Sequence, residues 1–154
     1  MRLPAKQRLF EFNQIILGDY LGSGVSRRVY RCAVNPEYVV KVSDQAYSWQ
    51  NINEWEVWWY ADEKMRRWLA PCHAISPSGI YLIQQYVEPV RSAELPKTLP
   101  RFLVDQKQEN YGILNGRVVA RDYGSMVGLV NRVKGRRKAE WGAGGYDGAT
   151  LKGK

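Results

Sequence analysis

The sequence has few of the residues that most often bind zinc or act as nucleophiles. It contains one histidine, His73, and two cysteines, Cys32 and Cys72, which lie far apart without the spacing of metal ligands. We therefore expect no zinc site and interpret both cysteines as ordinary buried residues. Neighbouring residues of a strand face opposite ways, so His73 beside Cys72 predicts a structural histidine rather than a nucleophilic pair.

Long apolar runs are missing as well. No stretch approaches the roughly 18 apolar residues of a membrane-spanning helix, and no apolar run suited to a signal peptide follows the first residues. We expect a cytoplasmic protein with no membrane partner. A length of 154 residues, with 45% hydrophobic and 25% charged residues, predicts a single globular domain over residues 1–154.

Acidic residues are the scarcer charged group. There are 15 of them against 23 lysines and arginines, a net charge of +8. Residues 125–154 hold seven basic residues against Glu140 and Asp147, a net +5. A basic tail favours an acidic partner or nucleic acid. The alternative is a solvated, partly flexible end, which we expect for the last dozen residues because the stretch 141–148 is too glycine-rich to pack firmly.

The first half of the chain predicts five strands and one main helix. Residues 15–43 are typical of a three-stranded antiparallel meander, with turns at the glycines near residue 23 and at Asn35-Pro36. Residues 74–76 and 80–87 predict a further hairpin. Residues 48–69, between the meander and this hairpin, have helical periodicity.

One face of the predicted helix is apolar. It carries Trp55, Trp58 and Trp59, which we expect in the core rather than in a ligand cage. Glu54 falls on the flank of this face, where a carboxylate needs a cationic partner to offset desolvation. Glu56 is expected at the surface.

The second half predicts a hairpin instead of long helices. Three prolines between residues 88 and 100 disfavour a helix there. Asn115-Gly116 between two apolar runs predicts a tight turn. Pairing of residues 114 and 117 then places Asn110 opposite Arg121, next to Asp122. Strand pairing must loosen at this end for Asn110 and Asp122 to reach one metal ion.

A set of polar residues suits phosphate chemistry. Residues 105–110 and 122–124 supply a proton acceptor, a cation and two oxygen ligands for a divalent metal. The loop Gly22-Ser23-Gly24 joins two strands, which disfavours a dinucleotide-binding fold but suits a phosphate cover. Lys41 lies in an apolar strand, so it is either an edge lysine facing solvent or a phosphate-binding lysine held by Glu54.

In this order the motifs resemble those of the protein kinase fold, reduced to a minimum. The resemblance covers roughly residues 17–124. It rests on a glycine loop, a lysine on the third strand, a helix glutamate, a hinge, a catalytic loop and an Asp-Phe-Gly-like motif. The corresponding residues are Gly22 and Gly24, Val29, Lys41, Glu54, Gln84 to Val87, Asp105 to Asn110, and Asp122-Tyr123-Gly124.

The resemblance implies an α+β fold in two parts. The first is an N-lobe of about residues 15–87, built on a five-stranded antiparallel sheet with one main helix. The second is a much reduced C-lobe of residues 88–124, built on a catalytic loop and a β-hairpin. The basic residues 125–154 follow as a partly flexible tail.

The resemblance also implies ATP and Mg²⁺ as cofactors, and roles for individual residues. The glycine loop and Val29 would cover the nucleotide, and Lys41, held by Glu54, would orient its α- and β-phosphates. The hinge residues Gln85 and Val87 would face adenine, with Gln84 at the gatekeeper position. Asp105 would accept the proton of a substrate hydroxyl, and Lys107 would neutralise the γ-phosphate. Asn110 and Asp122 would hold Mg²⁺.

The chain departs from the kinase pattern in several places. Arg27 replaces the third glycine of the loop, where it either hinders approach to the phosphates or adds a cationic contact. Leu103-Val104 replaces the usual His-Arg, which implies no control by activation-loop phosphorylation. Too few residues follow the hinge and Gly124 to build the helical lobe that binds peptides. Short kinase-like chains of this sort occur in bacterial viruses.

Three functions remain open from the sequence. The first is a minimal ATP-dependent phosphotransferase acting on a protein hydroxyl or a small molecule, which the retained Lys41, Asp105, Asn110 and Asp122 favour. The second is a pseudokinase that inhibits or tethers a partner, which the missing substrate platform favours. The third is a nucleic-acid-binding protein. The third is disfavoured because its basic residues lack the interleaved aromatics of a stacking platform.

Overall fold

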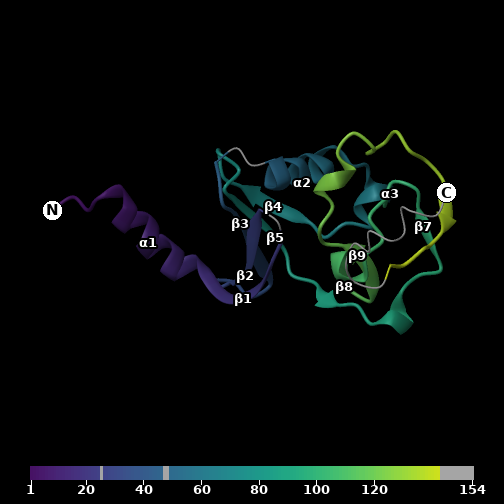
Figure 1. Cartoon of the computed structure of the whole chain (residues 1–154), viewed down its shortest axis with the longest axis horizontal. Helices are drawn as coiled ribbons and strands as arrows, with labels where there is room; N and C mark the ends of the chain where they lie inside the picture. The colour runs from purple at the N-terminus through teal and green to yellow at the C-terminus, as the bar shows by residue number, and fades with distance from the viewer. Residues whose placement is uncertain (25, 47–48, 143–154) are drawn as a thin grey trace, which may run out of the picture.

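A computed structural model describes residues 1–24, 26–46 and 49–142 and has an α+β architecture (Figure 1). Its largest sheet is antiparallel, with strand order β1-β2-β3-β5-β4. The five-stranded sheet predicted from sequence is thus confirmed. Its strands are β1 Leu17–Ser23, β2 Arg27–Cys32, β3 Tyr38–Ser43, β4 Cys72–Ile75 and β5 Tyr81–Gln85.

A helix that the sequence analysis missed precedes the sheet. Helix α1, Ala5–Ile16, includes Ile15 and Ile16, which were assigned to the first strand. That assignment is wrong because the helix continues until β1 starts at Leu17. Residues 5–14 contain no glycine or proline and are rich in good helix formers, which was the available signal.

The predicted helix over residues 48–69 is shorter than expected and divided in two. Helix α2 spans Trp49–Tyr60, and α3 spans Glu63–Arg66. The break has a local cause, since the Asp62 carboxylate accepts a hydrogen bond from Met65 N at 2.9 Å and caps the second helix. Beyond α3 the chain turns, and Leu69 bridges to Ala120 at the end of the C-terminal hairpin.

The buried face of α2 differs from the prediction. Its buried residues are Asn51, Glu54 and Val57, so the face is centred on Glu54 and not on the tryptophans. Trp59 is 60% exposed, which corrects its placement in the core. Trp55 and Trp58 are half-buried against the core, and Glu56 is exposed as expected.

The second half forms a small three-stranded sheet of order β6-β8-β9. Strand β6 is Glu88–Pro89, β8 is Tyr111–Leu114 and β9 is Arg117–Ala120. The predicted hairpin and its register are confirmed, since Leu114 pairs with Arg117. Asn115 (φ 50°) and Gly116 (φ 75°) have the left-handed conformations that a tight turn of this kind requires. Single 3₁₀ turns lie at η1 Ser92–Glu94, η2 Gln108–Asn110 and η3 Gly124–Met126.

Residues 125–142 are part of the fold and not a flexible tail, which corrects the prediction for that stretch. Strand β10, Arg136–Lys138, pairs antiparallel with β7, Thr98–Pro100. Trp141 packs its ring edge-on against Tyr111, with centroids 4.8 Å apart, and donates a hydrogen bond to Pro96 O. The expected flexibility of the last residues, 143–154, concerns positions outside the described residues.

The main core joins the two halves. It packs α2, α3 and β5 against β7, the β8–β9 hairpin and η3, with fully buried tyrosines at Tyr111 and Tyr123. Gly112 is needed where β8 passes the end of the first sheet. A Cβ at this position would lie 2.4 Å from Val87 Cγ2 and 2.6 Å from Glu88 O. Within the described residues, no helix combines the length and apolar character needed to cross a bilayer.

Candidate functional site

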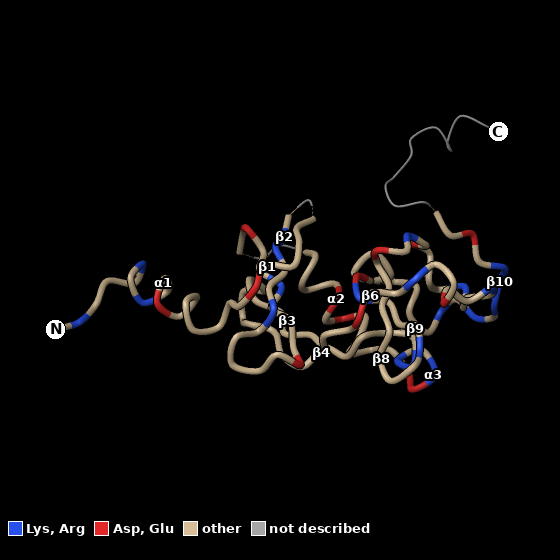
Figure 2. The backbone as a smooth tube through the Cα atoms, turned by 90° about the horizontal axis from the view of Figure 1, so that it is seen from below, with Lys and Arg blue, Asp and Glu red and all other residues tan. Residues whose placement is uncertain are grey.

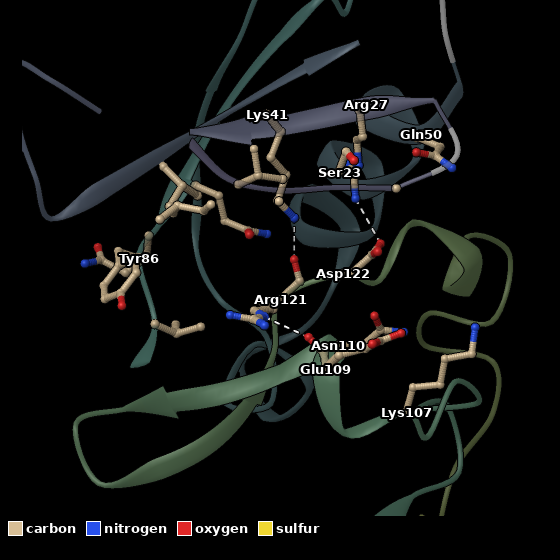
Figure 3. A pocket seen from close by; sticks show the side chains of 18 of the residues that line it. Ser23, Arg27, Lys41, Gln50, Tyr86, Lys107, Glu109, Asn110, Arg121 and Asp122 are labelled. Atoms are coloured by element: carbon tan, nitrogen blue, oxygen red, sulfur yellow. Dashed lines mark hydrogen bonds and ion pairs between the residues drawn. The ribbon is translucent and has the colours of Figure 1, made fainter. Parts of the chain in front are cut away.

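A cavity of about 530 Å³ lies between the five-stranded sheet and the C-terminal hairpin (Figure 3). Strands β1 to β3 form one side, and residues 105–110 and 121–122 form the other. Residues that are far apart in sequence therefore face one space. Ten of the residues selected from sequence line it: Gly22, Gly24, Val29, Lys41, Gln85, Val87, Asp105, Lys107, Asn110 and Asp122.

The eleventh predicted residue, Glu54, lies behind the cavity and holds Lys41. Both carboxylate oxygens of Glu54 are 3.0 Å from Lys41 Nζ. Lys41 is only 4% exposed and Glu54 is fully buried, so the alternative of a solvent-facing edge lysine is excluded. Lys41 Nζ also donates to Arg121 O, which ties β3 to the chain just before Asp122.

Arg27 lies at the centre of this cluster of charged residues, although the sequence left two roles open: hindering approach to the phosphates or adding a cationic contact. Its guanidinium is 2.5 Å from Glu54 Oε2 and 2.9 Å from Asp122 Oδ1, and its side chain is 5% exposed. The side chain points inward because β2 pairs Val29 with Lys41 and Arg27 with Ser43, which places all four on one face of the sheet. Arg27 therefore adds a buried cationic contact to the carboxylate that was predicted to bind metal.

Burial and ion pairing act in opposite directions on these groups. Burial disfavours ionised Glu54, but Arg27 and Lys41 outweigh this effect and hold the pKa of Glu54 below its ordinary value. Burial lowers the pKa of Lys41 despite the attraction of Glu54. Burial also acts to lower the pKa of Arg27, but Glu54 and Asp122 raise it overall. Two cations and two carboxylates thus form a charge-neutral cluster at the back of the cavity.

Asn51 is a further residue of this cluster that sequence reasoning missed. It is fully buried, and its Oδ1 accepts a hydrogen bond from Arg27 at 2.9 Å. Its amide donates to Lys41 O at 3.0 Å and to Gly79 O at 2.9 Å, so α2 is fastened to the sheet. The available signal was helical spacing, since Asn51, Glu54 and Val57 recur every three residues.

The Asp122-Tyr123-Gly124 segment is anchored to α2. Tyr123 N donates to Glu54 Oε1 at 3.1 Å, and the buried Tyr123 hydroxyl donates to Ala70 O at 2.6 Å. Gly124 passes so close to α2 that an added Cβ would lie 3.0 Å from Gln50 O. These contacts fix the backbone that follows Asp122, and the bond from Lys41 Nζ to Arg121 O fixes the backbone that precedes it.

Asn110 lies opposite Arg121, next to Asp122, as the hairpin register predicted. Strand pairing ends at Tyr111 and Ala120, and Arg121 N then donates to Asn110 O at 2.8 Å. In Figure 3 both side chains face the cavity, and the Asp122 side chain is 57% exposed. The described residues contain no cluster of three or more His, Cys, Asp or Glu side chains suited to a metal. The two oxygen ligands present fit Mg²⁺, which commonly takes one or two protein ligands together with phosphate oxygens.

Asp105 and Lys107 lie on a loop that the C-terminal segment supports. Tyr111 donates its hydroxyl hydrogen bond to Asp105 O at 2.8 Å, and Trp141 packs on the Tyr111 ring. Gly142 N donates to Gln106 O at 3.1 Å, and Gly142 forms a bridge with Lys107. The loop is therefore positioned by residues that the sequence analysis had assigned to a tail.

The opposite end of the cavity is formed by residues 84–87 and Arg121. Gln85 lines the cavity, but its side chain bonds to two residues that do not: it contacts His73 Nε2 and donates to Glu37 O. Val87 is buried and its neighbour Tyr86 lies beneath the Arg31 guanidinium, 3.4 Å from the ring centroid. Arg121 Nε donates to Glu109 O at 2.8 Å, and burial lowers the pKa of Arg121.

The remaining candidates are structural. Cys32 and Cys72 are buried free thiols, as the sequence analysis expected. Burial, with the nearby Glu54 carboxylate, raises the pKa of Cys72 to about 12. His73 is exposed and packs on Tyr38, with ring centroids 4.5 Å apart.

A scan against protein-family models finds no family that matches the sequence, and a search of curated proteins finds no match.

Proposed function

We propose that the chain is a minimal kinase-like protein that binds ATP in this cavity and transfers its γ-phosphate to a protein hydroxyl. The proposal is supported chiefly by one observation. Ten residues chosen for kinase-like roles, from six separate segments, line one cavity with the Lys41–Glu54 pair at its back. Residues selected only for unrelated structural reasons have no cause to converge in this way.

The charges of the cavity suit a nucleotide triphosphate. Lys41 is held by a carboxylate at the back, and Lys107 lines the opposite side near Asp105. A polyanion placed between them would gain electrostatic stabilisation from positioned cations in a partly desolvated site. Asp105 lines the same space and would accept the proton of an attacking hydroxyl.

Asn110 and Asp122 would hold Mg²⁺, which would neutralise phosphate charge when bound. The protein's contribution is to orient these two oxygen ligands through the Arg121–Asn110 backbone bond and the anchoring of Tyr123 on Glu54. Val29 and Val39 supply apolar lining on the sheet side, where a purine base would be covered.

A second candidate is a pseudokinase, a nucleotide-binding module that inhibits or tethers a partner without catalysis. Its support is the Arg27–Asp122 ion pair, because a guanidinium already occupies one oxygen of the proposed metal ligand. In either case the basic end around β10, which Figure 2 shows in blue, is the surface we assign to an acidic partner or nucleic acid.

A transfer assay with matched variants separates these candidates. Radiolabelled γ-phosphate would be followed from MgATP to the chain itself and to a peptide library rich in serine and threonine. We expect Asp105→Asn to abolish transfer and leave ATP binding nearly intact, whereas Asp19→Asn, at an exposed position on β1, changes neither. Transfer that survives Asp105→Asn would refute the role of Asp105. Binding with no transfer by the unaltered protein would favour the pseudokinase.

A further inference from the structure

Helix α1 exposes apolar side chains that the described part of the chain leaves largely uncovered. None of its residues is buried, and Leu9, Phe10, Phe12 and Ile15 are 48–63% exposed. Figure 1 shows the helix projecting away from the sheet. Its contacts with the sheet lie near its C-terminal end, where Phe12 touches the Tyr81 ring and Asn13 accepts a hydrogen bond from the Tyr81 hydroxyl at 2.7 Å. Ile16 O accepts a hydrogen bond from Ala33 N at 2.9 Å, and the Ile16 side chain packs beside Cys32, Val40 and Val42.

A short helix with exposed apolar side chains needs packing contacts to be stable. It has 12 residues, a length at which an isolated helix is marginal in water. Its ends give little help, since Pro4 caps it without a side-chain hydrogen bond, its first turn has no acidic residue and its last turn has no basic one. Packing of its apolar side chains against a partner would supply the missing stabilisation.

The outer face of α2 is the other unpartnered apolar helix surface in the described chain. It presents Trp49, Trp59 and Tyr60, which are 60–72% exposed, and Trp59 stacks on the half-buried Trp55 at 5.8 Å. Helix α2 also has 12 residues, so the two faces match in length. Tryptophan and tyrosine are the residues that most often dominate the energetics of protein interfaces.

The two helices have opposite charge. Residues 1–16 carry Arg2, Lys6 and Arg8 against Glu11, a net +2. Residues 49–63 carry no lysine or arginine, and three of their acids are exposed: Glu56, Asp62 and Glu63. Helix α3 adds two cations, of which Lys64 is exposed and Arg66 is engaged with Trp58 O and Trp59 O, so residues 49–66 still carry more acidic than basic residues. This complementarity favours α1 on α2 over two basic α1 helices side by side.

A single chain cannot make this contact. In both Figure 1 and Figure 2, α1 leaves β1 and points away from α2, with strands of the sheet between them. We therefore propose that the chain forms a dimer in which α1 of each copy packs on the outer face of α2 of the other. Two equivalent contacts close such a dimer by a two-fold axis. The interface does not include the cavity, so the proposal stands apart from nucleotide binding.

Sedimentation equilibrium of the full chain tests the proposal. We expect a mass of twice 17.8 kDa for the unaltered protein, and 17.8 kDa for Leu9→Glu and for Trp59→Glu measured separately. Both side chains are exposed, so both variants should keep the fold, checked by near-ultraviolet circular dichroism. Gln14→Glu, which adds the same charge at another exposed position of α1, should leave the dimer intact.

Mixing the two variants is the decisive arm. Leu9→Glu keeps an intact α2 face and Trp59→Glu keeps an intact α1, so their heterodimer has one of its two contacts unaltered. An equimolar mixture should therefore dimerise at concentrations at which neither variant does so alone. A mixture that stays monomeric would overturn the proposal. So would a Trp59→Glu variant that dimerises like the unaltered chain, or an unaltered chain that is monomeric up to about 100 μM. Binding of a monomeric chain to anionic lipid vesicles through α1 would also overturn it.

Discussion

Replacing Glu54 by glutamine should destabilise the protein strongly. The Glu54 carboxylate is fully buried between Lys41 and Arg27 and also accepts a hydrogen bond from Tyr123 N. Glutamine keeps one acceptor oxygen but turns an amide donor toward the Arg27 guanidinium, now 2.5 Å away, or toward Lys41. Both arrangements leave a buried cation without its counter-charge.

Removing one partner of a buried ion pair costs about 3–5 kcal/mol. For a domain of this size each kcal/mol lowers the melting temperature by roughly 2–4 °C, so Glu54→Gln should lower it by about 6–20 °C. Glu56→Gln on the exposed face of the same helix is the matched control and should change stability by less than about 0.5 kcal/mol. Thermal and urea unfolding of both variants measure the difference.

The loss should also depend on pH in a defined direction. The pKa of Glu54 is lowered in the folded state, mainly because Arg27 and Lys41 overcome the effect of burial. Its charge therefore stabilises the fold fully above the unfolded pKa of about 4.3, and this contribution is lost as the pH falls through the lower folded pKa. The difference in the free energy of unfolding between Glu54→Gln and the unaltered protein should be largest near neutral pH and shrink in acid. A gap as small as that of Glu56→Gln at pH 7 would refute the buried charge cluster.

Three further changes test other parts of the structure. Gly112→Ala should cost about 1–3 kcal/mol by overpacking against Val87 and Glu88, whereas Gly24→Ala, with nothing within 4 Å of the added Cβ, should cost little; equal urea midpoints would contradict this. Trp141→Ala should cost about 2 kcal/mol because it removes a half-buried ring from Tyr111, and an unchanged unfolding midpoint would show that residues 139–142 do not support the loop. Both cysteines should react with a thiol reagent at pH 8 only after unfolding, since Cys72 is buried and its pKa is raised to about 12; rapid reaction of the native protein would argue against this.

Local sequence signals predicted the features that depend on short-range pairing. The five strands, the turn at Asn115-Gly116 and the meeting of residues 110 and 121 follow from alternation and turn chemistry, and each is confirmed. Glu54 was identified as a carboxylate in need of a cation because it lies on the flank of an apolar helix face. Its pairing with Lys41 is now observed at 3.0 Å.

Features that depend on long-range packing were missed. Arg27 looks like a surface residue beside Arg28 in sequence, and its inward direction follows only from the register of β2 on β3. Strand β10 is a run of basic residues, and only its pairing with β7 makes it a strand. The basic charge assigned to a tail therefore lies largely in residues 125–142. A truncation after Lys134, made to test whether the basic end binds a partner, would also remove β10 and Trp141 from the fold. A truncation after Gly142 keeps both.

The position of α1 was also beyond local signals. Its residues favour a helix, but periodicity alone predicts an apolar face packed on the same chain, whereas none of its residues is buried. The buried face of α2 also differs from the one that apolar periodicity predicted, because contacts with the sheet decide which residues are buried. Asn51 and Glu54 are buried because Arg27 and Lys41 reach them from the sheet, so polar partners override apolar periodicity.

The most direct test of nucleotide binding is the melting temperature with and without MgATP. A ligand at 100 times its dissociation constant adds roughly 2.7 kcal/mol to stability, or about 5–11 °C for a domain of this size. We expect a rise of this order in the unaltered protein and a much smaller rise in Lys41→Met, in which Glu54 keeps Arg27 as its partner. The absence of a shift with MgATP and with any other nucleotide would contradict both the kinase and the nucleotide-binding pseudokinase.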